Sequence, residues 1–230
     1  MARIPELVHL HSHRHYRIIP SAYPAINFFE DLVDPAEMEI LWEIESLTND
    51  RLRQEAGDIF QVAPEDRICG QGTSVVMAAF THIGRPSRFT DGSYGVYYAS
   101  FSQKTAVRET VYHREKFLSA TSEEPCEITM RMYEGKLLQP LHDIRNDHYS
   151  QFHSPDNYVD SQIFGKNLRN NQSWGIVYNS VRDVNGECIA AFRPRSVSVP
   201  KPVTHLKYVW DGGSITDVIK ATSMLKMHDA

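Results

Sequence analysis

The sequence predicts one domain of the α+β class. A helical region precedes a mixture of strands and helices, and the elements lack the regular strand–helix alternation of a doubly wound sheet. Of the 230 residues, 41% are hydrophobic and 23% are charged, a balance typical of a chain that buries a core. Because no internal repeat or low-complexity linker interrupts the sequence, we expect a single domain over 1–230.

The N-terminal residues carry an alternating set of histidines. His9, His11, His13 and His15 would share one face of a strand, where they could chelate a metal. No acidic or thiol partner accompanies them in the sequence. We therefore expect a frayed N-terminal arm rather than a metal site.

A first helix is predicted over 35–48. Asp34 is suited to the N-cap and Pro35 to the first helical position, and Glu37 follows Asp34 at the spacing of a capping box. Further along, the apolar run over 74–83 fits a buried helix or a buried strand, and periodicity does not decide between them.

A loop, a strand and a helix are predicted to follow one another. Turn-forming residues predict the loop over 84–95. Residues 96–100 (VYYAS) predict the strand, and residues 104–118 predict a helix with an apolar side.

The remainder of the chain is predicted to be mainly β. Five short runs predict strands: 127–133, 136–141, 175–181, 188–194 and 205–210. Glu134 and Gly135 are expected to form a hairpin turn between the first two. Residues 142–173 are rich in His and Asn and are expected to form loops.

Charge and composition argue against several classes of protein. The formal net charge is 24 − 29 = −5, which disfavours direct binding of nucleic acid. No apolar run is long enough to span a membrane, and the N-terminus lacks the apolar stretch of a secretory signal. The 3 cysteines are scattered, as expected for buried thiols in a reducing cytoplasm. We therefore expect a cytoplasmic location.

The well-known cofactor and catalytic motifs are missing from the sequence. It contains no glycine-rich Rossmann fingerprint, no P-loop, no zinc-protease helix motif and no nucleophile elbow. A dinucleotide would have to be bound by another scheme.

Three residues in the predicted loop, strand and helix could together break a ribosyl bond. Arg88 offers a planar cation for phosphate, Tyr98 a flat ring, and Glu109 a carboxylate that could stabilise a developing cation. Tyr97 points the other way in the strand and is expected in the core. Spacing alone leaves open a surface arginine, a core tyrosine and a solvated glutamate.

Two segments together resemble the RES-domain family. GRPSRFTDGSYGVYYAS followed by TAVRETVYH is similar to that family's G-R-F/W element, Y-x-A strand end and T-A-x-x-E helix. WGIVYNSVRDVNGECIAAFRP is similar to its G-I-x-Y-x-S-V-R segment, and HYRII resembles its opening strand. The Arg, Glu and Ser of the family name are best matched by Arg88, Glu109 and Ser180.

The resemblance implies an ADP-ribosyltransferase-like fold with two packed, mostly antiparallel sheets and a cleft. It also implies a toxin that consumes NAD⁺ by cleaving the nicotinamide–ribose bond, by phosphorolysis or hydrolysis, or that transfers ADP-ribose to a protein. NAD⁺ would be the substrate, inorganic phosphate is one co-substrate left open, and no metal is expected. The partner would be an Xre-type antitoxin that blocks the cleft. Because 25–83 is longer than the same region of compact RES domains, we interpret it as a mainly helical insertion.

The resemblance assigns a role to each matched residue. Arg88 would bind the pyrophosphate, with Arg17 assisting. Tyr98 would pack on the nicotinamide or its ribose, and Glu109 would stabilise positive charge as nicotinamide departs. Ser180 would hydrogen-bond the substrate, because no base is placed beside it to make it a nucleophile.

Two further residues complete the expected substrate site. Phe89 follows Arg88 as in the family pattern, which favours Arg88 over the competing Arg85. Arg182 lies two residues after Ser180 and would share its strand face.

Two other classes of function remain open at this point. One is a catalytically silent binding subunit of a toxin–antitoxin complex. The other is a ribonuclease toxin, which the acidic balance disfavours. The sequence leaves open the acceptor, the oligomeric state and whether a homo-oligomer forms.

Overall fold

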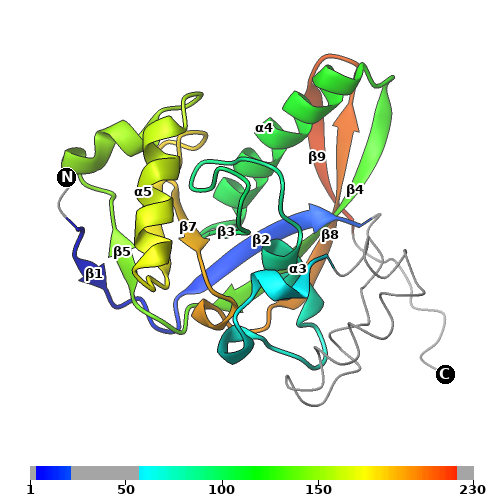
Figure 1. The fold of residues 1–230 in the computed structure, drawn as a ribbon. Coiled ribbons are helices and arrows are strands. Elements are labelled where there is room, and N and C mark those ends of the chain that lie inside the picture. The colour runs from blue at the N-terminus through cyan, green and yellow to red at the C-terminus, as the bar shows by residue number, and fades with distance from the viewer. Residues whose placement is uncertain (1–3, 22–56, 222–230) are drawn as a thin grey trace.

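The computed structural model describes residues 4–21 and 57–221 and has a mixed α/β architecture (Figure 1). The helix predicted over 35–48 lies outside the described residues, as does most of the proposed insertion. The strands are β1 (Leu7–Val8), β2 (Arg14–Pro20), β3 (Tyr97–Ser100), β4 (Cys126–Lys136), β5 (Leu141–Asp143), β6 (Gly175–Asn179), β7 (Glu187–Ala191), β8 (Lys201–Trp210) and β9 (Ile215–Ala221). The helices are α3 (Ser74–Thr81), α4 (Gln103–Thr121) and α5 (Val159–Asn170), with 3₁₀ turns at Ile59–Gln61, Pro64–Asp66, Asp147–His153 and Pro194–Ser196. No helix among these residues is long and apolar enough to cross a membrane.

The described strands form one sheet in the order β1-β5-β6-β7-β3-β2-β4-β8-β9, and not the two separate sheets expected. Every neighbouring pair is antiparallel except β5 and β6, which confirms the mostly antiparallel character. The two halves of the sheet are joined by a single residue pair, Tyr16 with Ser100. In the antiparallel register Arg17 would follow opposite Ala99, but no further pair joins the described residues of β2 and β3. The halves separate beyond this pair.

Helix α4 forms where it was predicted and begins with a side-chain cap. The Ser102 hydroxyl accepts a hydrogen bond of 3.0 Å from the Thr105 amide. At the other end, Ser122 adopts the left-handed conformation, with φ of 53°, that ends many helices. The apolar run at 74–83, which was open between helix and strand, contains helix α3.

The hairpin expected at Glu134 and Gly135 does not form, because β4 runs straight through both residues. Gly135 lies opposite the buried His15 of β2. A Cβ at Gly135 would approach two atoms of the imidazole ring to 2.8 Å. The glycine therefore makes room for a side chain instead of turning the chain.

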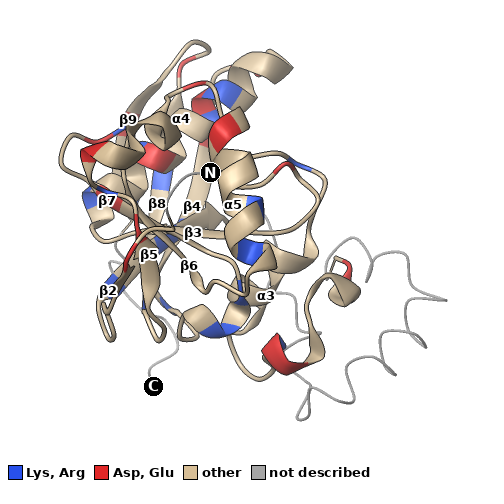
Figure 2. Ribbon diagram, turned by 60° about the vertical axis from the view of Figure 1, so that its left-hand side comes forward, with Lys and Arg blue, Asp and Glu red and all other residues tan. Residues whose placement is uncertain are grey.

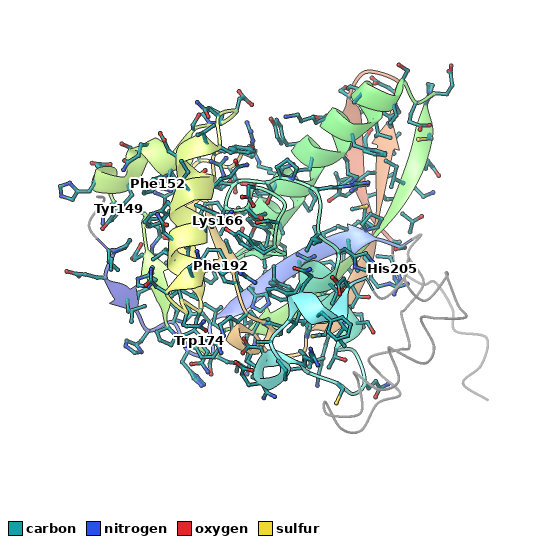
Figure 3. The ribbon with its side chains drawn as sticks, viewed as in Figure 1. Tyr149, Phe152, Lys166, Trp174, Phe192 and His205 are labelled. Atoms are coloured by element: carbon teal, nitrogen blue, oxygen red, sulfur yellow. The ribbon has the colours of Figure 1, made fainter. Side chains whose placement is uncertain are left out.

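The prediction of loops throughout 142–173 was wrong, because helix α5 lies within this stretch. Figure 3 shows Phe152 beside α5, where its ring stacks on Phe164 at 4.2 Å between centroids. Gly165 lets the helix approach the loop of Arg88, since a Cβ there would come within 2.4 Å of the Phe89 carbonyl oxygen. This contact places α5 against one wall of the site.

Of the four alternating histidines, His15 does not belong to a frayed arm, because it lies in β2, the strand that the resemblance of HYRII predicted. His15 lies in β2, is fully buried, and its Nε2 is 3.1 Å from the Tyr97 hydroxyl. Pairing with β4 along its length fixes this strand. Within the described ranges, no group of three or more His, Cys, Asp or Glu could hold a metal ion.

The burial of His15 predicts a dependence of stability on pH. Burial, with added repulsion from Arg17, lowers the pKa of His15 from 6.5 to about 3. Between these two pKa values the unfolded chain binds a proton at His15 and the folded protein does not. The contribution of His15 to stability is therefore fully present above pH 6.5 and is lost as pH falls toward 3. From pH 7 to pH 5 we expect His15 to cost about 2 kcal/mol of the free energy of unfolding. His15→Gln should show a shallower loss in urea unfolding at the two pH values, and equal losses in both proteins would contradict this role.

Candidate functional site

A pocket of about 830 Å³ lies where the two halves of the sheet separate. Its walls come from consecutive residues of β2, from Tyr98 to Ser100 of β3, from one side of α4 and from the loop that follows α3. This volume is within the range of pockets that hold a small molecule or cofactor. The join between the sheet halves therefore positions a binding cavity.

The described lining of this pocket is strongly cationic although the whole chain is acidic. It contains six arginines: Arg17, Arg85, Arg88, Arg114, Arg131 and Arg182. Among the described lining residues, Glu109 supplies the sole carboxylate. Basic and acidic positions are interspersed along the ribbon as a whole (Figure 2), so this excess of positive charge is local to the pocket. Such a cavity attracts an anionic ligand.

Glu109 of α4 is held by Ser180, which follows β6. The Ser180 hydroxyl donates to Glu109 Oε1 at 2.5 Å and accepts from the amides of Arg182 and Asp183 at 3.1 and 3.0 Å. Because two N–H groups occupy the lone pairs of Oγ, its proton is directed to the carboxylate. Ser180 is not among the described lining residues of the pocket. Its hydroxyl donates to Glu109, whereas the resemblance implied a hydrogen bond from Ser180 to the substrate.

Arg88 lines the pocket and also fixes a neighbouring loop. Its Nη1 donates to the carbonyl oxygens of Phe152 and Ser154 at 3.2 and 2.7 Å. Its guanidinium lies 4.7 Å from the centre of the Tyr158 ring, a cation–π distance. The side chain is only 8% exposed, so this charge is well ordered at the pocket wall.

Tyr98 presents its ring to the pocket while its hydroxyl holds the arginine loop. The hydroxyl accepts from the Phe89 amide at 3.0 Å and is 2.8 Å from Ser87 Oγ. Burial raises the pKa of Tyr98 to about 12, so the phenol stays protonated. Tyr97 is fully buried, which confirms its predicted place in the core.

Removing the Tyr98 hydroxyl should loosen the loop that carries Arg88. In Tyr98→Phe the buried Phe89 amide would lose its acceptor, at an expected cost of about 1–3 kcal/mol in the free energy of unfolding. Ser87→Ala is the matched control, because it removes the other hydrogen bond of that hydroxyl and leaves the amide bonded. Chemical denaturation of both variants checks this, and equal effects would remove the special role of the amide bond.

Phe89 does not line the pocket, contrary to the expected substrate contact. It is fully buried and packs edge-on against Tyr178, with 5.0 Å between ring centres. The ring anchors the loop in the core beneath α5, while the preceding Arg88 faces the pocket. The adjacent pair thus combines a packing residue with a site residue.

Arg17 reaches the pocket from β2. Its Nη1 donates to the Tyr98 carbonyl oxygen at 2.9 Å, and its guanidinium lies 4.5 Å from the centre of the Tyr97 ring. Its Nε is buried and has no hydrogen-bond partner within the part of the chain that the structure describes. Arg17 therefore lines the same pocket as Arg88, the arginine that it was expected to assist.

Arg182 also lines the pocket and ties three segments together. Its Nη2 donates to the Pro155 carbonyl oxygen at 2.5 Å and lies 3.7 Å from the Asp156 carboxylate. Its guanidinium covers the Tyr112 ring of α4 at 3.4 Å from the ring centre. These contacts fix the guanidinium of Arg182, and its amide bonds to Ser180, the residue that holds Glu109.

Sequence reasoning missed several lining residues, among them Arg114, Arg131 and Tyr158. The alternation of buried Met130 and Met132 with Arg131 in β4 was a signal that the arginine faces away from the core of that half. Tyr158 directly precedes α5, and the missed helix concealed its position.

The family comparison agrees with this geometry. The family model described as RES domain matches residues 64–211, which include the loop of Arg88, the helix of Glu109 and the turn of Ser180. The chain belongs to the RES-domain family. Arg17 lies outside the matched RES region.

Two similar proteins accompany the family match. An uncharacterized protein, y4oC of Sinorhizobium fredii, is 27% identical over 213 residues, covering 87% of this chain and 84% of that protein. A chain in the crystal structure of the M. tuberculosis MbcT–MbcA toxin–antitoxin complex is 10% identical, with a TM-score of 0.39, covering 60% of this RES protein and 92% of that chain.

Proposed function

We propose that this RES-domain protein cleaves the nicotinamide–ribose bond of NAD⁺. The observation that carries the proposal is the position of Glu109, which Ser180 holds at the wall of a pocket lined by six arginines. Glu109 is the one carboxylate among the described lining residues. The pyrophosphate of NAD⁺ is an anion that guanidinium groups bind well. The ribose becomes cationic as nicotinamide leaves, and a fixed carboxylate stabilises that charge.

The chemistry needs few protein groups. The bond from the anomeric carbon to the pyridine nitrogen breaks with its electron pair going to nitrogen, so nicotinamide departs neutral and needs no general acid. Arg88 and Arg17 would hold the pyrophosphate, and Tyr98 would pack on the nicotinamide or its ribose. An acceptor then bonds to the anomeric carbon and releases any surplus proton to solvent.

The acceptor defines three versions of the reaction. Phosphate gives ADP-ribose-1″-phosphate, water gives ADP-ribose, and a protein side chain gives an ADP-ribosylated protein. An ADP-ribosyltransferase-like arrangement is part of the proposal. Its support is the division of the sheet into two halves. One residue pair joins them, and the pocket lies where they separate.

A toxin role with an Xre-type antitoxin partner belongs to the same proposal. Its support is the membership in the RES-domain family together with the resemblance of the T-A-x-x-E and S-V-R segments. An antitoxin that covered the pocket mouth would prevent NAD⁺ from entering.

The experiment is incubation of the purified protein with NAD⁺, with and without inorganic phosphate, followed by mass spectrometry of the products. Free nicotinamide supports the proposal, and the second product identifies the acceptor. Intact NAD⁺ under all conditions, including with added cell extract as a source of protein acceptors, would overturn it in favour of a binding subunit. RNA cleavage with intact NAD⁺ would instead favour a ribonuclease.

A further inference from the structure

The turn from Ser180 to Gly186 is attached to α4 by two side-chain hydrogen bonds, one helical turn apart. Thr105 Oγ1 donates to Asp183 Oδ2 at 2.8 Å, and Ser180 Oγ donates to Glu109 Oε1 at 2.5 Å. Thr105 and Glu109 are four residues apart and therefore lie on the same side of the helix. One bond thus fixes the turn to the helix, and the other joins the turn to the carboxylate of the pocket.

Asp183 connects these two bonds through its own backbone. Its carboxylate accepts from Thr105, its amide donates to Ser180 Oγ at 3.0 Å, and its carbonyl accepts from the Gly186 amide at 2.9 Å. The residue is only 4% exposed. A displacement of its side chain would therefore move the amide that orients the Ser180 hydroxyl.

The two cations near Asp183 contribute less than the hydroxyl. Lys104 Nζ and Arg108 Nε lie 3.2 and 3.4 Å from Oδ1, but their side chains are 67% and 53% exposed. Exposed ion pairs contribute little because solvent screens them. The buried bond from Thr105 is the more directional attachment.

The turn also packs directly on Thr105. A Cβ at Gly186 would come within 2.7 and 2.8 Å of the Thr105 side-chain atoms, so no larger residue fits between them. The Ser180 amide donates to the Gly186 carbonyl at 2.7 Å and closes the turn. Gly186 therefore packs directly on Thr105 of the helix and is hydrogen-bonded to Ser180.

We propose that Thr105 and Asp183 are positioning residues that fix the Ser180 hydroxyl on Glu109 and so set the direction in which the carboxylate meets the ribose. This inference gives the threonine of T-A-x-x-E a role that the glutamate alone does not explain. Its activity readout rests on the proposed NAD⁺ cleavage. Small displacements of a positioned catalytic group reduce rate more than binding.

The kinetic test compares Thr105→Val, which is isosteric but lacks the hydroxyl, with Thr105→Ser, which keeps it. We expect kcat for nicotinamide release to fall about 10- to 100-fold in Thr105→Val, with KM within about threefold, and Thr105→Ser to recover most of the loss. Leu118→Ala is the matched control, because it removes buried packing from the same helix, does not line the pocket and leaves the Thr105–Asp183 bond. An equal loss of kcat in Leu118→Ala would show that helix stability is the cause, and would overturn the proposal.

A double-mutant cycle distinguishes positioning from an independent effect. In a Ser180→Ala background, Thr105→Val should cost less than about threefold in kcat, because the hydroxyl that it positions is already gone. Full additivity of the two substitutions would overturn the proposal.

Hydrogen exchange provides a test that does not depend on NAD⁺. The amides of Arg182 and Asp183 both donate to Ser180 Oγ, and their exchange should accelerate about tenfold or more in Thr105→Val but not in Thr105→Ser. Unchanged exchange in Thr105→Val would overturn the positioning role. If the wild type releases no nicotinamide, the proposed function fails, while the exchange result still decides this inference.

Discussion

Glu109→Gln is expected to lower kcat for nicotinamide release about 100- to 1,000-fold, with little change in thermal stability. The amide is isosteric and its oxygen can still accept from Ser180, so the local structure should persist. The substitution removes the sole carboxylate among the described lining residues of a pocket with six arginines. Without it, positive charge developing on the ribose faces only cations and neutral groups, and the transition state loses its fixed counter-charge.

Glu115→Gln is the matched control on the same helix. Its carboxylate accepts from the Ile215 amide at 2.8 Å and does not line the pocket, so kcat should stay close to that of the wild type. Steady-state nicotinamide release and thermal unfolding of both variants make the comparison. Turnover by Glu109→Gln within threefold of the wild type would remove Glu109 from the catalytic role.

Local patterns in the sequence predicted much of what surrounds this carboxylate. The alternation in VYYAS correctly places Tyr97 in the core and Tyr98 at the pocket, because successive strand residues face opposite sides. The helix of T-A-x-x-E forms as expected, and its first turn carries the buried Thr105 and Ala106. Both features depend on neighbours within a few residues, which periodicity reports directly.

Features that depend on distant contacts were not predictable in the same way. Gly135 in a strand pattern suggested a turn, yet its position opposite His15 is set by pairing of β4 with β2. Helix α5 was missed because its buried face consists of a few residues around Gly165 and depends on the loop of Phe89 for its packing. The sequence did not predict the positive charge of the pocket, because its arginines come from separate segments. The net charge of −5 is a sum over the whole chain and does not report this local excess.

Arg88→Lys is expected to lower kcat/KM about 100-fold and the free energy of unfolding by about 2 kcal/mol. Lysine keeps the positive charge but lacks the planar fork, so it cannot keep both carbonyl bonds and still present N–H groups to a pyrophosphate. It also loses the stacking on Tyr158. The loss therefore reports guanidinium geometry rather than charge.

Arg85→Lys is the matched control, three residues earlier in the same loop. Arg85 lines the pocket but is exposed, and no hydrogen bond or ion pair to another described residue fixes its guanidinium. Replacing one exposed cation by another changes little where no bond orients the guanidinium, so the effect of Arg85→Lys on kcat/KM should be at least tenfold smaller than that of Arg88→Lys. Nicotinamide release at varied NAD⁺ and urea unfolding measure both quantities. A larger loss of kcat/KM in Arg85→Lys than in Arg88→Lys would assign the anion-binding role to Arg85. Arg88 would then serve only to hold the 152–158 loop, and its substitution would lower stability without affecting recognition of the pyrophosphate.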